Sequence, residues 1–151
     1  MQTWQIHIQG IVQGVGFRPT IFQIAHEQRI RGEVSNGVEG VKVLFNASID
    51  DADHLYQSIL KQKHPISIIT HSRLQEISPR SFEDFQIVES QSYGKKRLLL
   101  TPDYALCEDC KKEMWEEGNR RNGYPFITCT QCGPRYSIIS ALPYDRPWTA
   151  M

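Results

Sequence analysis

Two Cys-x-x-Cys motifs near the C-terminal end of the chain restrict its fold more than any other feature of the sequence. Cys107 and Cys110 form the first motif, Cys129 and Cys132 form the second, and eighteen residues separate the two motifs. Two such pairs at this spacing are typical of a zinc site with four thiolate ligands. Two disulfides or a redox-active dithiol are the alternatives, and both are less favoured in a chain without export features.

The predicted metal centre is structural. All five histidines lie at or before position 71, which favours four thiolates over a local mixed site of cysteine and histidine. Four protein ligands complete a tetrahedral shell around zinc and leave no open position for water. We therefore expect zinc to contribute to the folding free energy of a small module and to take no part in catalysis.

The uneven distribution of histidine and cysteine indicates two units with different chemistry. A polar stretch with one glycine and three consecutive basic residues separates them, and such a stretch is typical of a linker. We predict a first domain over residues 1–91, a linker over 92–101, a four-cysteine zinc-finger module over 102–142 and a C-terminal tail over 143–151.

The composition excludes several classes of protein. Seventeen Lys and Arg residues balance seventeen Asp and Glu residues, so the chain offers no strongly basic field for nucleic acid or anionic lipid. No apolar run approaches the roughly 18 residues that a membrane span requires, and the N-terminal segment lacks the apolar core of a signal peptide. We expect a cytoplasmic protein that binds neither nucleic acid nor a membrane.

Hydrophobic periodicity predicts the first elements of the N-terminal unit. Trp4, Ile6 and Ile8 alternate with polar residues, as in a half-buried strand. After a glycine-bearing loop, apolar residues at helical spacing continue to about Gln28. Two short strands follow, and the Asn-Gly pair that begins at Asn36 is a strong hairpin signal.

The rest of this unit completes a βαββαβ order. Acidic residues at 50–53 begin a second helix, which Pro65 prevents from continuing. Residues 66–76 and 82–89 have the weaker alternation of a fourth and a fifth extended segment. The order predicts an α+β fold of the ferredoxin-like type, in which an antiparallel sheet carries both helices on one face.

The loop between the first strand and the first helix is the candidate functional site. Residues 10–18 read Gly-Ile-Val-Gln-Gly-Val-Gly-Phe-Arg, and the glycines allow backbone N–H groups to converge on an anion. The helix N-terminus favours a phosphate there, and Arg18 adds a charged fork. The alternative is a tight turn with a solvated arginine. The segment lacks the features of a Walker loop and of the dinucleotide-binding motif, which disfavours nucleotide binding.

This loop is part of a pattern that resembles the acylphosphatase family. Residues 10–18 are followed by Gly-x-Val-x-Asn at 32–36 and by Gly-Val-x-Val at 40–43, and the resemblance covers nearly all of residues 1–91. It implies that Arg18 and the loop amides bind the phosphate of an acyl phosphate, that Asn36 positions the attacking water, and that hydrolysis needs no cofactor. The implied phosphate-binding loop consists of Gln13, Gly14, Val15, Gly16, Phe17 and Arg18.

The four-cysteine module resembles the zinc-finger region of the HypF family, the carbamoyltransferases of nickel-iron hydrogenase maturation. The resemblance is carried by the two cysteine motifs, by residues 120–136 around the second motif, and by Pro-Tyr-Asp-Arg-Pro-Trp-Thr at 143–149. It implies carbamoyl phosphate as substrate and, for the full-length family, HypE as partner. We expect this chain to be an N-terminal fragment that cannot perform carbamoyl transfer by itself.

Three functions remain open from the sequence. The favoured one is hydrolysis of carbamoyl phosphate to carbamate and phosphate by the module around Arg18. A free-standing acylphosphatase of broad specificity is the second, with a zinc module that contributes only stability. The third is a noncatalytic module, in which the loop retains phosphate and the zinc unit docks neighbouring domains.

Overall fold

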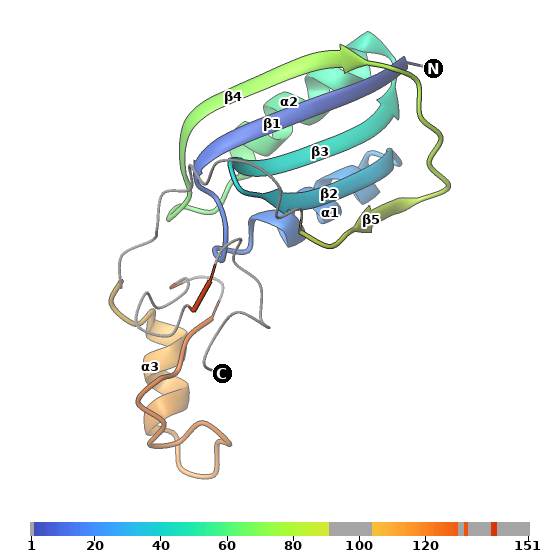
Figure 1. Ribbon diagram of the computed structural model, residues 1–151. Coiled ribbons are helices and arrows are strands. Elements are labelled where there is room, and N and C mark those ends of the chain that lie inside the picture. The colour runs from blue at the N-terminus through green and yellow to red at the C-terminus, as the bar shows by residue number, and fades with distance from the viewer. Residues whose placement is uncertain (1, 91–103, 130–131, 133–139, 142–151) are drawn as a thin grey trace.

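The computed structural model describes residues 2–90, 104–129, 132 and 140–141 (Figure 1). Its first part has the order βαββαβ followed by a short fifth strand, which confirms the predicted ferredoxin-like order. The predicted linker and the predicted C-terminal tail lie outside the described residues, so the domain boundaries stay predictions. The elements are β1 (Gln2–Ile11), α1 (Phe17–Glu27), β2 (Arg31–Gly37), β3 (Gly40–Ala47), α2 (Ile49–Gln62), β4 (Ile68–Ile77), β5 (Phe85–Ile87) and α3 (Glu108–Trp115).

The sheet has five strands in the order β4-β1-β3-β2-β5. β1 pairs antiparallel with β3 and β4, and β2 pairs antiparallel with β3, as predicted. β5 pairs parallel with β2, so the prediction of a wholly antiparallel sheet is wrong.

The path of the chain after β4 explains the parallel pairing of β5. Beyond β4, the backbone of Arg80 donates to the Thr3 hydroxyl and accepts from the Asn46 side chain, at the end of the sheet where β1 begins and β3 ends. β2 also begins at this end, because Arg31 pairs with Asn46. A chain that crosses here to the far edge therefore runs beside β2 in the same direction.

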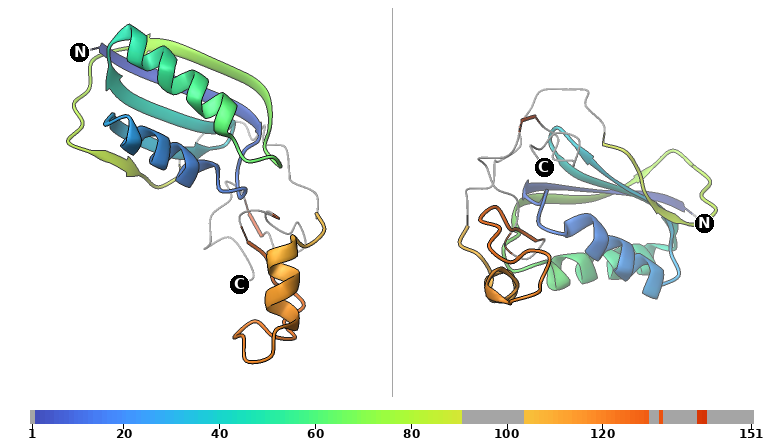
Figure 2. Two further views of the ribbon diagram at one scale, coloured as in Figure 1. Left: turned by 180° about the vertical axis from the view of Figure 1, so that it is seen from behind. Right: turned by 90° about the horizontal axis from the view of Figure 1, so that it is seen from below.

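Both helices of the first domain cover one face of the sheet, as predicted (Figure 2). Alternate residues of β1 and β3 point to that face, and removal of their apolar surface from water stabilises the packing. The buried residues come from every layer, which gives the domain one continuous core. They include Trp4, Ile6 and Ile8 of β1, Val41, Val43 and Phe45 of β3, Ile21 and Ile24 of α1, and Leu55 and Ile59 of α2.

Local sequence signals position the two helices. The Ser48 hydroxyl caps α2 by accepting a hydrogen bond from the backbone N–H of Asp51 at 3.2 Å, and acidic residues in the first turn complement the helix dipole. α1 begins at Phe17, so Pro19 lies in its first turn, where its missing N–H removes no helical hydrogen bond. These signals explain why the predicted helices agree closely with the observed ones.

The described part of the cysteine module contains one helix, α3, which begins directly after Cys107. The chain then returns along the end of this helix, because the backbone N–H of Gly123 donates to the carbonyl oxygen of Met114 at 2.9 Å. A small core forms from Cys110, Cys132 and Ile127. None of the helices in the described parts of the chain has the length and apolar character needed to cross a membrane.

Candidate functional site

The loop between β1 and α1 has the backbone conformation that its glycines were predicted to allow. Gly14 and Gly16 have φ values of 75° and 70°, in the left-handed region that other residues rarely adopt. Val12, Val15 and Phe17 alternate with these positions and are buried in the core. The buried apolar side chains thus hold the loop against the core, while the glycines allow its backbone to curl.

The N-terminus of α1 and Arg18 lie in the same turn. Gly16 is the N-cap and has no side chain that could cap the helix, and the first turn contains no acidic residue. The hydroxyl of Thr20 donates to the carbonyl oxygen of Gly16 at 3.0 Å and closes this turn. Since the helix dipole is positive here and the half-buried Arg18 lies in the same turn, the turn suits an anion.

Asn36 reaches the same end of the sheet from β2. It is 1% exposed and lies one residue before the end of the strand. The side-chain amide of Gln13 in the loop donates to the carbonyl oxygens of Gly37 at 2.8 Å and Gly40 at 3.0 Å, in the turn that follows Asn36. These two hydrogen bonds bring the predicted phosphate loop beside the strand end that carries the predicted water-positioning residue.

The side chain of Gln13 is the part of the site that sequence reasoning missed. The resemblance places Gln13 in the phosphate loop but assigns no contact to its side chain. Its two acceptors lie 24 and 27 positions further along the chain. Only the pairing of β1 with β3, and of β3 with β2, places these residues side by side.

The four cysteines of the second unit converge on one point. Their sulfur atoms all lie within 4.8 Å of one another, with Cys107 and Cys129 at 3.5 Å and Cys110 and Cys132 at 3.9 Å. Sulfurs that bind one zinc ion tetrahedrally at about 2.3 Å lie about 3.8 Å apart. None of these four cysteines forms a disulfide, so the donor set fits the predicted four-thiolate site better than two disulfides.

The surroundings of the cysteines shift the pKa values of Cys110 and Cys132 in opposite directions. Burial raises the pKa of the Cys110 thiol. Burial also acts to raise the pKa of Cys132, but backbone hydrogen bonds at Cys129 and Cys107 and a contact with the Thr128 hydroxyl outweigh it and lower this pKa to about 6. Hydrogen bonds that favour a thiolate are the expected surroundings of a sulfur that binds a metal ion.

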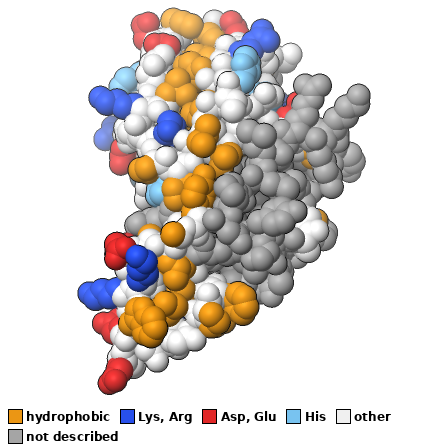
Figure 3. Space-filling model, turned by 90° about the vertical axis from the view of Figure 1, so that its left-hand side faces the viewer, with side chains coloured by type: hydrophobic (Ala, Val, Ile, Leu, Met, Phe, Trp, Pro, Cys, Tyr) orange, Lys and Arg blue, Asp and Glu red, His pale blue; other side chains and the backbone are white. Residues whose placement is uncertain are grey.

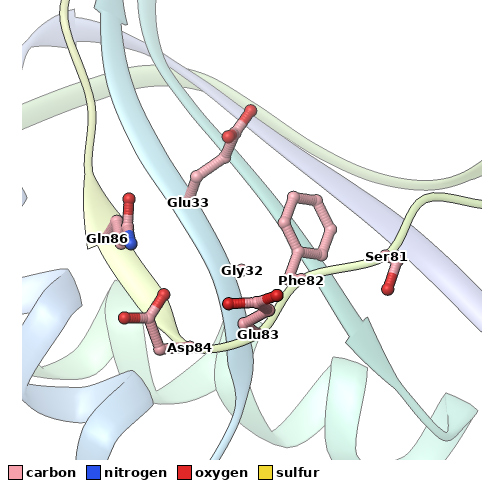
Figure 4. A pocket seen from close by; sticks show the side chains of 7 residues that line it. All are labelled: Gly32, Glu33, Ser81, Phe82, Glu83, Asp84 and Gln86. Atoms are coloured by element: carbon pink, nitrogen blue, oxygen red, sulfur yellow. The ribbon is translucent and has the colours of Figure 1, made fainter.

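A separate hollow lies at the β5 edge of the sheet. It measures about 190 Å³ and is lined by three carboxylates, Glu33 on β2 and Glu83 and Asp84 on the segment before β5 (Figure 4). These negative charges repel a phosphate, so this hollow is a poor anion site compared with the loop before α1.

The finger exposes aromatic side chains. Trp115 at the end of α3 is 76% exposed, and Tyr124 and Phe126 are exposed with their rings in edge-to-face contact at 6.0 Å. Figure 3 shows hydrophobic side chains on the surface at this end of the molecule.

Comparison with known proteins assigns a family to each unit. Residues 4–87 match the family model Acylphosphatase, and residues 106–139 match the model described as HypF finger. A crystal structure of acylphosphatase from Bacillus subtilis has a TM-score of 0.54 and 28% identity, and the match covers 58% of this chain and 99% of that one.

Larger relatives match both units in the same order. The probable carbamoyltransferase HypF of Methanocaldococcus jannaschii is 40% identical over 94% of this chain, and the match covers 19% of that protein. A crystal structure of full-length HypF in the phosphate- and nucleotide-bound form has a TM-score of 0.87 and 40% identity over 98% of this chain, and the match covers 20% of that chain.

The chain thus spans about a fifth of the length of these HypF relatives. Its first unit has the acylphosphatase fold and carries the loop described above, and its second unit has the cysteine cluster of the matched finger. The chain therefore belongs to the acylphosphatase family, and its two units together match the N-terminal region of the HypF-type carbamoyltransferases.

Proposed function

We propose that the acylphosphatase domain of this chain hydrolyses an acyl phosphate, and that the substrate is carbamoyl phosphate. The observation that carries the proposal is the link between Gln13 and the turn at Gly37 and Gly40, because it brings the anion-binding loop beside Asn36. Membership of the acylphosphatase family supports the reaction class, and the match to HypF carbamoyltransferases supports the carbamoyl group.

The loop and Arg18 bind the phosphate in this proposal. The left-handed Gly14 and Gly16 allow consecutive N–H groups to point toward one anion, and Arg18 adds a fixed positive charge. Charge that develops on the equatorial phosphate oxygens during reaction is stabilised by these donors, which need no reorganisation. No strong base is required for this contribution.

Asn36 holds the attacking water by hydrogen bonding to its side-chain amide. The water oxygen forms a bond to phosphorus while the bond from phosphorus to the acyl oxygen breaks. Carbamoyl phosphate and water thereby give carbamate and dihydrogen phosphate. Carbamate is a good leaving group, so alignment of the water can replace general base catalysis.

The second unit holds a structural zinc ion through Cys107, Cys110, Cys129 and Cys132. When bound, the ion supplies a fixed tetrahedral cross-link between the cysteine pair at the start of α3 and the second cysteine pair. The thiolates take all four positions, so the proposal gives this centre no role in hydrolysis.

In a HypF-type carbamoyltransferase of nickel-iron hydrogenase maturation, this domain supplies carbamate to the carbamoyl-transfer steps, which end at HypE. The sequence described here spans about a fifth of such relatives, and the proposal assigns only the hydrolytic step to this part.

The test is phosphate release from carbamoyl phosphate and from benzoyl phosphate, corrected for spontaneous decay. The wild-type chain is compared with Arg18→Ala and Asn36→Ala, and we expect both variants to lose at least about 100-fold in turnover. Preference for carbamoyl phosphate supports the HypF role, and equal turnover of both substrates indicates a broad acylphosphatase. Tight phosphate binding by a wild-type chain without turnover would contradict the proposal and indicate the noncatalytic module.

A further inference from the structure

We propose that the side chain of Gln13 is a positioning residue, which sets the placement of Asn36 relative to the phosphate loop. This inference rests on the proposed function, because it concerns the geometry of the same hydrolytic site. It assigns to the Gln13 side chain a direct connection to the turn after β2, in addition to the place of this residue in the phosphate loop.

The geometry at Gln13 is that of a bridge between two segments. The residue is 7% exposed, and its Nε2 atom donates to Gly37 and Gly40 at 2.8 and 3.0 Å. A primary amide has two N–H bonds, and both are directed at carbonyl oxygens of one turn. The two bonds together fix the side-chain rotation as well as the distance between loop and turn.

Asn36 is the functional residue that this bridge would control. It precedes Gly37 directly, and it pairs with Val41 in the register that also pairs Gly37 with Gly40. A shift of the turn relative to the loop therefore moves Asn36 relative to any phosphate bound there. Displacement of a positioned reactant by about 1 Å can cost on the order of 100-fold in rate.

The fold itself does not depend on the bridge. β2 and β3 are held by their own ladder from Arg31 to Gly37, and β3 is held by β1 through seven paired positions. The loop is anchored separately by Val12, Val15 and Phe17 in the core. Gln13 adds the connection between these two well-held parts, which is what a positioning residue requires.

The experiment compares Gln13→Met with the wild-type chain. Methionine has a similar length and keeps the packing, but it donates no hydrogen bond. Gln28→Met is the matched control, because Gln28 also donates a side-chain hydrogen bond, to the Ser58 hydroxyl at 3.0 Å, on the helical side of the domain. Steady-state hydrolysis of carbamoyl phosphate and competitive inhibition by inorganic phosphate are measured for each variant.

We expect Gln13→Met to lower kcat by about 10-fold to 100-fold. The inhibition constant of inorganic phosphate should change by less than about threefold, because the anchored loop still binds the anion. Gln28→Met should change neither quantity. Circular dichroism and thermal unfolding confirm that each variant is folded, and Gln13→Asn, which keeps the amide but shortens its reach, replaces Gln13→Met if the latter does not fold.

A double-mutant cycle separates positioning from a structural effect. If Gln13 acts through Asn36, Gln13→Met should change the residual rate of Asn36→Ala by less than about twofold. The inference would be overturned if Gln13→Met lowered the rate by the same factor in the wild-type chain and in Asn36→Ala. It would also be overturned if Gln13→Met left kcat unchanged. Either result would leave the proposed function intact. A wild-type chain that hydrolyses neither carbamoyl nor benzoyl phosphate would overturn the proposed function first and this inference with it.

Discussion

The backbone of Gly40 lies so close to that of Ile8 that a β-carbon on Gly40 would be 2.0 Å from the carbonyl oxygen of Ile8. Gly40 also has a φ of 135°, a conformation that side chains with a β-carbon rarely adopt. Its carbonyl oxygen accepts one of the two hydrogen bonds from Gln13. The same glycine therefore permits the pairing of β3 with β1 and presents an acceptor to the candidate site.

Gly40→Ala should destabilise the first domain strongly. The added carbon overlaps backbone atoms that cannot rotate away, and the positive φ adds strain. We expect the free energy of unfolding to fall by about 3 kcal/mol, measured by urea denaturation of the intact chain.

Gly37→Ala is the matched control for this substitution. Gly37 lies in the same turn and has an ordinary φ, and a β-carbon added to it would lie 3.8 Å from its nearest neighbour, the Gly40 carbonyl oxygen. The free energy of unfolding of this variant should change by no more than about 1 kcal/mol. Equal losses for the two variants would show that the close approach to Ile8 is not the cause.

Arg18→Ala should weaken phosphate binding while leaving the fold intact. Arg18 is half-buried in the first turn of α1, and its proposed role is to supply charge and not packing. We expect the inhibition constant of inorganic phosphate to rise at least about tenfold, because one charge-assisted contact is lost. Arg31→Ala, at the other end of β2 from Asn36, is the control and should bind phosphate like the wild type. Unchanged binding by Arg18→Ala would exclude the arginine from the site.

Removal of zinc should unfold the finger and leave the first domain folded. The purified chain is expected to contain one zinc ion, measured by atomic absorption, and Cys129→Ser should lose it. We expect the intrinsic tryptophan fluorescence, to which Trp115 on α3 contributes, to change on chelation, while the unfolding midpoint of the acylphosphatase domain stays the same. Lys111→Gln, an exposed change on the same helix, should keep the metal. A folded Cys129→Ser finger without zinc would contradict the structural role.

The first domain should lose stability in mild acid through His7. Burial lowers the pKa of His7 below its ordinary value of 6.5, and the charges of Lys42 and His71 lower it further against the opposing effect of Glu39. The unfolded chain therefore takes up the proton first as pH falls. This contribution to stability is fully present above about pH 6.5 and is lost as pH falls through the lower pKa of the folded state.

His7→Gln should reduce this acid sensitivity. We expect the difference in the free energy of unfolding between pH 7 and pH 5 to become smaller, measured by urea denaturation at each pH. His54→Gln is the control, because His54 is exposed on α2. The expectation fails if both variants reduce the difference in the free energy of unfolding between pH 7 and pH 5. It also fails if neither variant reduces that difference.

Local patterns in the sequence predicted most of the first domain. Alternation at Trp4, Ile6 and Ile8 located β1, and the glycines at 14 and 16 indicated a loop whose backbone can curl. The Asn-Gly pair at Asn36 indicated the hairpin of β2 and β3, but both of its residues still pair within β2 and the turn itself falls at residues 38–39. These features follow from neighbouring residues, because strand periodicity, turn geometry and positive φ are set by side chains a few positions apart.

The sequence by itself determined the order of elements and the presence of two cysteine pairs, whose spacing already matched a metal site with four cysteine ligands. Tertiary structure alone decided that β5 runs parallel to β2 and that Gln13 bridges to Gly37 and Gly40. Both depend on which strands lie side by side and on where the chain crosses the end of the sheet. Such contacts join residues far apart in the chain, and no local pattern records their partners.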